Sequence, residues 1–106
     1  VYIHSKLMIV NDVYTTQGSA NINTRSMMGD SELNICHEYA DTTQQLRRRL
    51  WGLHMGNKGA QDDPKDAFKA WGELIEGNIR LRSKKLSPNT SLVEFHYGEA
   101  NYKDFD

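Results

Sequence analysis

The spacing of the apolar residues changes once along this chain, near residue 40, and this change limits the fold more than any other feature. Before it, β-branched and aromatic residues dominate 2–10 and 13–17, with the polar pair Asn11-Asp12 between them. Two such runs around a turn signal predict a β-hairpin. The run 32–38 alternates in part between polar and apolar residues, which predicts a third strand.

Beyond residue 40 the apolar residues recur at helical spacing. One helix is predicted to begin at a capping box of Asp41 and Gln44 and to end at Gly56. A second helix is predicted to begin with Asp63 as its N-cap and Pro64 in its first turn. The two apolar stripes are formed by Leu46, Leu50, Leu53 and His54, and by Phe68, Trp71, Leu74 and Ile75. We therefore expect an α/β fold, with a β-hairpin plus third strand of a mixed sheet followed by packing helices.

The remaining stretches are less regular. Residues 18–31 are rich in Gly, Ser, Asn and Asp, which predicts a loop with one short helical turn. Gly77 is expected to end or kink the second helix, and 83–106 has the mixed composition of an arm that packs on another part of a protein. Val1-Tyr2-Ile3 already has the character of strand interior, and 106 residues with 38% apolar content give a thin core. We therefore expect this chain to be one segment of a longer protein.

Composition excludes some partners. Thirteen basic against fourteen acidic residues leave a net charge of -1, so we expect no nucleic-acid partner, and any phosphate recognition must be local. The basic groups 47–49 and 80–85 are interpreted as solvated helix faces, with contact to anionic headgroups as the alternative. The single cysteine, Cys36, is expected to be a buried strand thiol. No apolar run is long enough to span a membrane, and no signal segment opens the chain.

The residues suited to chemistry concentrate near the start of the chain. His4 and Lys6 are two residues apart in a predicted strand, so their side chains leave the same face. Ser19 and Asn21 follow in a loop that Gly18 begins, which brings hydroxyl, amide and backbone N–H donors near that face. Together these groups form a clamp for phosphate oxygens that includes a nucleophile or an acid.

This pattern resembles the phospholipase D superfamily signature, His-x-Lys-x4-Asp-x6-Gly-Ser-x-Asn. Here it reads His4-Ser5-Lys6, then Asn11, then Gly18-Ser19-Ala20-Asn21, so two separated blocks fall in register. The flanking residues, including Asp30-Ser31-Glu32 and 48–56, look most like the second, C-terminal motif of eukaryotic-type phospholipases D. Bacterial enzymes of this type, some of them secreted effectors, carry similar sequences. We thus assign 1–56 to the second-motif half-site segment and 57–106 to a C-terminal helical and irregular extension.

The resemblance implies a phosphodiesterase that hydrolyses glycerophospholipids, or transfers their phosphatidyl group, through a phosphohistidine. Two motifs build one site in this superfamily, so an N-terminal half would supply the other, and peripheral membrane contact is expected. His4 is then the general acid and base, or alternatively the nucleophile. Lys6, Ser19 and Asn21 stabilise charge on the phosphate oxygens, and Glu32 is the candidate acceptor that orients the His4 imidazole.

One motif position departs from the signature, because Asn11 replaces its aspartate. By parity from His4 this position lies off the reactive face, so we expect a structural role that holds the turn, as Gly18 begins the loop. Asparagine keeps an acceptor but loses the charge. Two interpretations stay open: the site remains active with asparagine at this position, or the chain represents a weakened or inactive form.

Other interpretations also stay open. A homodimeric endonuclease of the superfamily, a phosphatidyltransferase such as a cardiolipin synthase and a non-catalytic remnant are the alternative functions. His37 beside Glu38 lacks a second ligand pair, so no metal is expected, and no cofactor is implied. His54 is interpreted as a hydrogen-bonded core histidine. Three methionines, Met8, Met27 and Met28, are interpreted as packing residues, with an acyl-chain entrance as the alternative.

Overall fold

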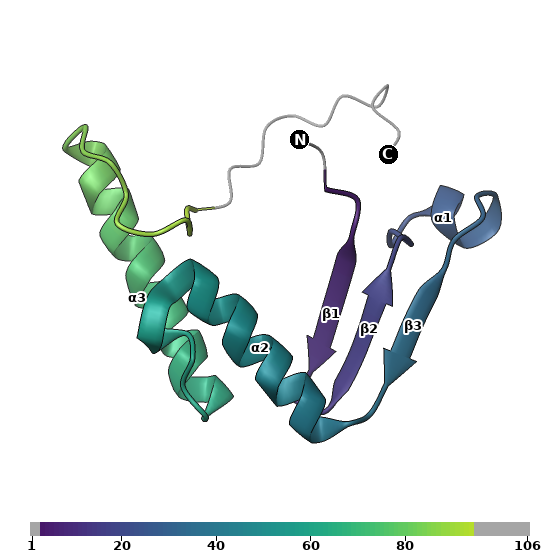
Figure 1. The fold of residues 1–106 in the computed structure, drawn as a ribbon. Helices are drawn as coiled ribbons and strands as arrows, with labels where there is room; N and C mark the ends of the chain where they lie inside the picture. The colour runs from purple at the N-terminus through teal and green to yellow at the C-terminus, as the bar shows by residue number, and fades with distance from the viewer. Residues whose placement is uncertain (1–2, 95–106) are drawn as a thin grey trace. The chain divides into compact units, whose positions relative to one another are not determined.

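The computed structural model describes residues 3–94, which form two compact units that divide between Gln44 and Gln45. In chain order the elements are β1 (Lys6–Val10), β2 (Tyr14–Gly18), α1 (Thr24–Met28), β3 (Asn34–His37), α2 (Ala40–Met55), the 3₁₀ turn η1 (Gly56–Lys58) and α3 (Pro64–Ser83) (Figure 1). The predicted hairpin, third strand, short helical turn and two helices are confirmed. The strands are shorter than predicted, and Tyr2 lies outside the described residues.

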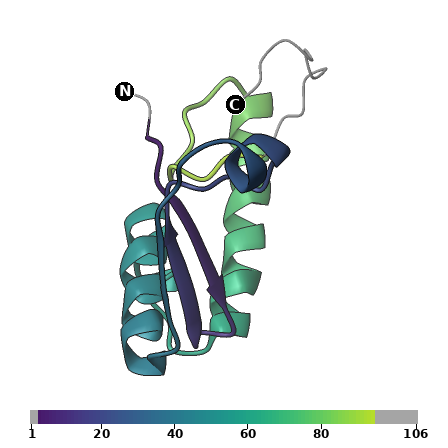
Figure 2. The ribbon, with the colours of Figure 1, turned by 90° about the vertical axis from the view of Figure 1, so that its right-hand side faces the viewer.

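The first unit is built on a three-stranded antiparallel sheet in the order β1-β2-β3. Lys6 pairs with Gly18, and Gly18 pairs with Asn34 on its other side. Between residues 3 and 94 no strands pair in parallel, so the described sheet is not mixed. Figure 2 shows α1 at the end of the sheet where β1 begins and β2 ends. This end therefore collects the segments that carry the two motif blocks.

A tight turn joins β1 to β2. The Val13 N–H donates to the Val10 carbonyl at 3.0 Å, and the two residues between them, Asn11 and Asp12, have φ values of 52° and 54°. Positive φ at both central positions is the mark of a type I′ turn, and asparagine and aspartate are among the few residues that adopt it readily. Asn11 thus lies in the turn, at the opposite end of β1 from His4.

The first turn of α2 is fastened to the sheet through two threonines. Thr43 is fully buried, and its hydroxyl donates to the Val13 carbonyl at 2.8 Å. Because that hydroxyl has one proton, Thr15 must be the donor in the 2.7 Å bond between the Thr15 and Thr43 hydroxyls. The predicted capping box is wrong by position: α2 begins at Ala40, which places Asp41 inside the first turn.

The second unit contains the rest of α2 together with η1 and α3. The predicted start of α3 is confirmed, since the Asp63 side chain accepts from the Lys65 N–H at 2.8 Å and Pro64 is the first helical residue. The predicted helix end at Gly77 is wrong, because α3 continues through this residue to Ser83. Trp51 of α2 and Trp71 of α3 meet edge to face, with ring centroids 4.8 Å apart. This pair joins the two helices.

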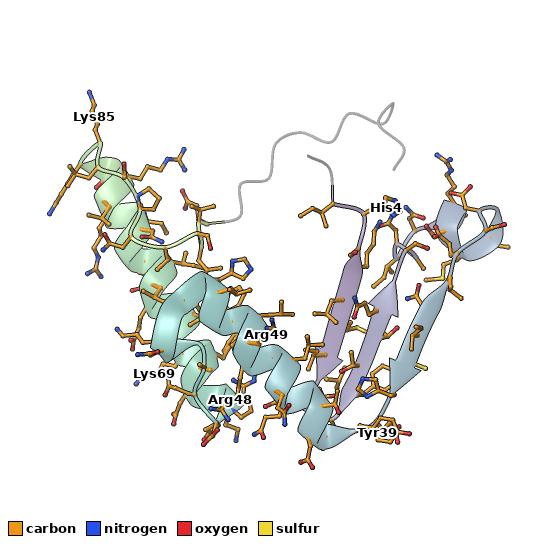
Figure 3. All side chains as sticks on the ribbon, in the orientation of Figure 1. His4, Tyr39, Arg48, Arg49, Lys69 and Lys85 are labelled. Atoms are coloured by element: carbon orange, nitrogen blue, oxygen red, sulfur yellow. The ribbon has the colours of Figure 1, made fainter. Side chains whose placement is uncertain are left out.

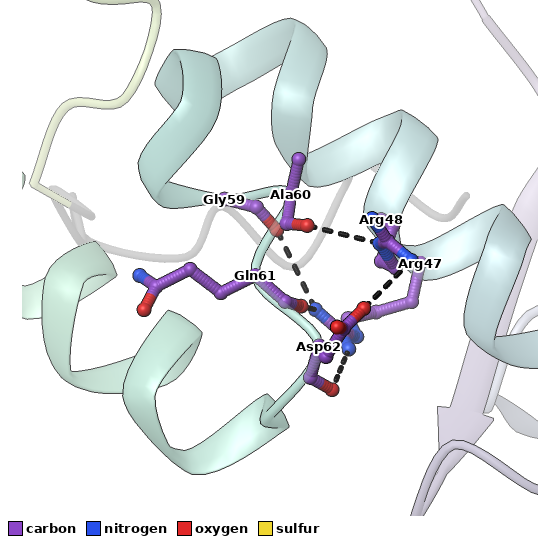
Figure 4. Close-up of polar contacts among 6 residues, drawn as sticks. All are labelled: Arg47, Arg48, Gly59, Ala60, Gln61 and Asp62. Atoms are coloured by element: carbon purple, nitrogen blue, oxygen red, sulfur yellow. Dashed lines mark hydrogen bonds and ion pairs between the residues drawn. The ribbon is translucent and has the colours of Figure 1, made fainter.

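Arg47 is 2% exposed, so its interpretation as part of a solvated basic face is wrong. Its guanidinium donates to the carbonyl oxygens of Gln61 at 2.8 Å, Asp62 at 2.9 Å and Gly59 at 3.5 Å (Figure 4). The neighbouring Arg48 donates to the Ala60 carbonyl at 2.9 Å and forms a 2.7 Å ion pair with the Asp62 carboxylate. The adjacent arginines therefore hold the 59–62 loop against α2 by donating to its backbone carbonyl groups.

A buried asparagine ties the segment after α3 back onto that helix. Asn78 donates to the Thr90 hydroxyl at 2.9 Å and to the Leu92 carbonyl at 2.5 Å, and it accepts from the Asn89 N–H at 3.0 Å. The described part of the predicted arm, 84–94, thus packs on its own helix. Residues 95–106 of that arm lie outside the described residues.

Few apolar side chains are buried. Within residues 3–94 the buried apolar residues are Met55, Ala67 and Ala70, all in the second unit. Cys36 is exposed rather than buried as predicted, and Phe68 is 68% exposed although it lies on the predicted stripe. His54 is hydrogen-bonded as predicted, at 2.8 Å to the Ser91 hydroxyl, but it is exposed and not part of a core. Within residues 3–94, many side chains of the apolar pattern are thus exposed.

Candidate functional site

The predicted site residues meet at one end of the sheet, where Figure 3 labels His4 just ahead of β1. A cavity of about 500 Å³ is lined there by His4, Ser19, Asn21 and Glu32. Lys6, the first residue of β1, lines a second cavity of about 340 Å³, and Asn21 lines both. All five predicted catalytic positions are thus in these two cavities of the first unit.

Lys6 has the most informative environment. Its Nζ is buried and has no hydrogen-bond partner in the part of the chain that the structure describes. Burying an ammonium group costs free energy unless the group is paired with an opposite charge. The environment of Lys6 therefore favours the binding of an anion. A phosphate oxygen is an anion that the neighbouring donors of this site would also suit.

Glu32 is held by two serine hydroxyls. Ser19 donates to one carboxylate oxygen in a short hydrogen bond, and Ser26 donates to the other at 2.7 Å. The Ser19 hydroxyl oxygen also accepts from the Leu33 N–H at 3.2 Å. Chiefly because of the bonds from Ser19 and then Ser26, the pKa of the Glu32 carboxyl is lower than its usual value, despite some desolvation. The nearby charges of His4 and Lys6 lower the pKa in the same direction.

The glycine of the motif is required by close packing. A Cβ at Gly18 would lie 2.6 Å from the Asn34 Cα and closer still to the Leu33 carbonyl oxygen. The Asn34 side chain occupies the same space and accepts from the Ala20 N–H at 3.1 Å. Gly18 therefore lets β3 approach the loop that carries Ser19 and Asn21.

The sequence analysis missed the residues that α1 contributes. Asn23 is the N-cap of α1, and its side chain accepts from the Ser26 N–H at 2.8 Å. Ser26 is 9% exposed, and Arg25 forms a 2.8 Å ion pair with Asp30, which also lines the larger cavity. An asparagine directly before a short helical turn was the available signal, since it is a preferred N-cap.

The second cavity is mainly apolar. Met8 and Met27 line it with Leu7 and Ile22, next to Lys6 and Asn21. Met8 is 48% exposed and Met28 is 84% exposed, so the interpretation of the methionines as packing residues is wrong for the described part of the first unit. Asn21 thus lines both a polar cavity and an apolar one.

The pKa of Glu32 predicts how stability depends on pH. Because this pKa is lower in the folded chain than in the unfolded chain, the stability it contributes is fully present above the unfolded value and is lost as the pH falls through the folded value. A Glu32→Gln variant should therefore be less stable than the parent near pH 7, and the difference should shrink below about pH 4. Urea unfolding followed by circular dichroism measures both. A difference that stays constant with pH would contradict the expectation.

The sequence model of a family described as "Phospholipase D" matches residues 1–72. The chain belongs to the phospholipase D family. This confirms the resemblance, and the sheet and helices confirm an α/β fragment of the phospholipase D fold.

The relatives of this phospholipase D segment include proteins of Arabidopsis thaliana and of Dictyostelium discoideum. It is 49% identical to phospholipase D alpha 4 of Arabidopsis thaliana over 84 residues, which are 73% of the chain and 11% of that relative. Identity to phospholipase D delta of the same plant is 37% over 113 residues, or 91% of the chain and 13% of the relative. Phospholipase D A of Dictyostelium discoideum is 43% identical over 74 residues, 53% of the chain and 6% of the relative. No solved structure matches.

The chain thus spans 11% and 13% of the length of the two Arabidopsis phospholipases D. Residues 3–94 were also compared with what a membrane-spanning helix and a metal site require. No helix among them is long and apolar enough to cross a membrane. No three of their His, Cys, Asp or Glu side chains are grouped so that they could hold a metal ion, and His37 instead accepts from the Tyr39 N–H at 3.2 Å.

Proposed function

We propose that this phospholipase D segment supplies half of a phosphodiesterase site, and that the complete site hydrolyses glycerophospholipids or transfers their phosphatidyl group to an alcohol. The observation that carries the proposal is the buried Nζ of Lys6, which has no partner in the described residues. His4, Ser19 and Asn21 lie around the same end of the sheet. A phosphodiester monoanion would neutralise the lysine and accept hydrogen bonds from these groups.

In the proposed reaction the imidazole of the other motif attacks phosphorus. The bond from phosphorus to the headgroup oxygen breaks, and the His4 imidazolium gives that oxygen its proton. Neutral His4 then takes a proton from water or an alcohol, whose oxygen attacks the phosphohistidine and releases the first imidazole. Lys6 and Asn21 stabilise the charge that develops on the non-bridging oxygens. In our proposal, the other motif belongs to an N-terminal half of the complete protein.

Glu32 has a supporting role in this proposal. It lies close enough to His4 for the two charges to interact, and it accepts hydrogen bonds from Ser19 and Ser26. We assign it to orient the His4 imidazole and to stabilise the imidazolium form. Ser19 then acts on the site through Glu32 as well as through the phosphate.

The cavity lined by Met8, Ile22 and Met27 favours a lipid over a nucleic acid as the substrate. A nucleic acid presents charged phosphates along its whole backbone, whereas a phospholipid presents an apolar portion beside a single phosphodiester. The net charge of -1 offers no general attraction for a polyanion. The proposal therefore includes contact with a membrane surface and excludes a nucleic-acid partner.

The proposal is tested by assembly. The 106-residue chain alone should release no choline or ethanolamine from vesicles of phosphatidylcholine and phosphatidylethanolamine. Together with the segment that carries the other motif, it should release them, form phosphatidylalcohol when a primary alcohol is present, and keep its activity in EDTA. Lys6→Ala in the assembled protein is the matched control for activity that arises elsewhere.

Three outcomes would count against the proposal. Full turnover by a demonstrably monomeric sample of this chain would contradict the half-site. Cleavage of DNA without cleavage of lipid would replace the lipid by a nucleic acid. Loss of activity with chelator would overturn the reaction written above.

A further inference from the structure

Ser26 carries a buried hydroxyl and lines the polar cavity. It lies in α1, is 9% exposed and donates to one Glu32 carboxylate oxygen at 2.7 Å. Ser19 donates to the other oxygen of the same carboxylate. The carboxylate is therefore held from two elements at once, by the loop after β2 and by α1.

The hydroxyl of Ser26 is not needed to build α1. The N-cap bond of this helix runs from the backbone N–H of Ser26 to the Asn23 side chain at 2.8 Å, and an alanine would keep it. Among the described residues, the hydrogen bond that the hydroxyl itself donates goes to Glu32. Because α1 keeps its own hydrogen bonds when this hydroxyl is removed, the buried hydroxyl has its role outside the helix.

We propose that Ser26 is a positioning residue, whose hydroxyl fixes the Glu32 carboxylate in the orientation that directs the His4 imidazole. This inference rests on the proposed function, in which His4 moves the proton of the leaving group. A carboxylate held by one hydroxyl can rotate about its terminal bond, whereas two hydroxyls on opposite oxygens define its plane. The imidazole that it orients is then aligned before substrate arrives.

The charges around the carboxylate support this assignment. His4 and Lys6 are the positive groups that act on Glu32, and both favour its ionised form. Arg25 and Asp30, the other charged residues of the cavity, form an ion pair at 2.8 Å. The two serine hydroxyls are thus the largest influence that favours the ionised carboxylate, and as directional hydrogen-bond donors they also fix its orientation.

The first test measures the carboxylate itself in the 106-residue chain, without any activity assay. The carboxyl ¹³C signal of Glu32, assigned through Glu32→Gln, is followed against pH in the parent, in Ser26→Ala and in Ser26→Thr. Thr24→Ala removes a hydroxyl from an exposed position of the same helix and is the matched control. We expect the titration midpoint of Glu32 to rise in Ser26→Ala and to stay at the parent value in Ser26→Thr and Thr24→Ala.

The second test measures turnover of phosphatidylcholine by the assembled protein. Ser26→Ala should lose about tenfold in turnover, the lower end of what removal of an outer partner of a functional histidine costs. Ser26→Thr should restore it, which a purely structural defect would not allow. Thr24→Ala should not change it.

The outcomes separate this inference from the proposed function. An unchanged Glu32 midpoint in Ser26→Ala overturns the inference, and so does full turnover by that variant. A raised midpoint without lipid turnover by any parent preparation overturns the proposed function, and with it the catalytic part of the inference. A raised midpoint with turnover that falls in Ser26→Ala and returns in Ser26→Thr supports both.

Discussion

Replacing His4 with alanine should reduce turnover of a natural phospholipid by roughly 10²–10⁴-fold in the assembled protein, the range that general acid–base catalysis supplies. The loss should be far smaller against a p-nitrophenyl phosphodiester. An alkoxide of high pKa needs a proton in the transition state, whereas a nitrophenolate leaves without one. Steady-state rates on the two substrates measure the difference, and the phosphohistidine formed from the activated substrate should still be trapped.

Lys6→Ala and Asn21→Ala are the controls for this prediction. The charge on the non-bridging oxygens develops whatever the leaving group is, so these variants should lose rate on both substrates. If His4→Ala abolishes the trapped phosphohistidine, or if peptide mapping finds the phosphoryl group on His4, then His4 is the nucleophile and the two roles are exchanged.

Replacing Arg47 with methionine should destabilise the second unit by about 3–5 kcal/mol, as expected when one partner of a buried charged interaction is removed. Methionine preserves much of the side-chain length but leaves the carbonyl groups of Gln61 and Asp62 without their donor. Hydrogen bonds to charged groups contribute about 1.5–3 kcal/mol each, which accounts for the size of the effect. Denaturant unfolding followed by tryptophan fluorescence measures it, because Trp51 lies 5.5 Å from the guanidinium of Arg47.

Arg49→Met is the matched control, since Arg49 is exposed on the same helix. It should change the free energy of unfolding by no more than about 0.5 kcal/mol. Arg47→Lys should fall between the two, because an ammonium cannot span several carbonyl groups as a guanidinium does. Equal stability of Arg47→Met and Arg49→Met would show that the buried contacts do not hold the 59–62 loop.

Local signals in the sequence were enough to predict the strands and helices and to group the residues of the candidate site. The hairpin follows from Asn11 and Asp12 because positive φ at two successive positions suits few other residues. The start of α3 follows from Asp63 and Pro64, whose preferences act within a single turn. His4 and Lys6 were grouped with Ser19 by the motif spacing, and the register of Lys6 with Gly18 brings the two blocks to one end of the sheet.

Burial could not be predicted in the same way, because it depends on which surfaces meet. Arg47 lies in a run of three arginines that resembles a solvated face, and only the return of the 59–62 loop makes it the buried member. Cys36 and Phe68 carry apolar patterns that the described residues leave uncovered. Ser26 could not be predicted as a site residue, because its importance depends on a hydrogen bond to Glu32, six positions further along the chain.

The scarcity of buried apolar side chains has a calorimetric consequence. In the first unit, large apolar residues such as Leu33, Ile35 and Met28 are more than half exposed. The heat-capacity change of unfolding grows with the apolar surface that unfolding exposes, so this unit on its own should unfold with a small one. Association with an N-terminal half that covers these side chains should show a negative heat-capacity change. In the proposed assembly, much of the hydrophobic free energy would thus be released when the two halves associate and not when this unit folds.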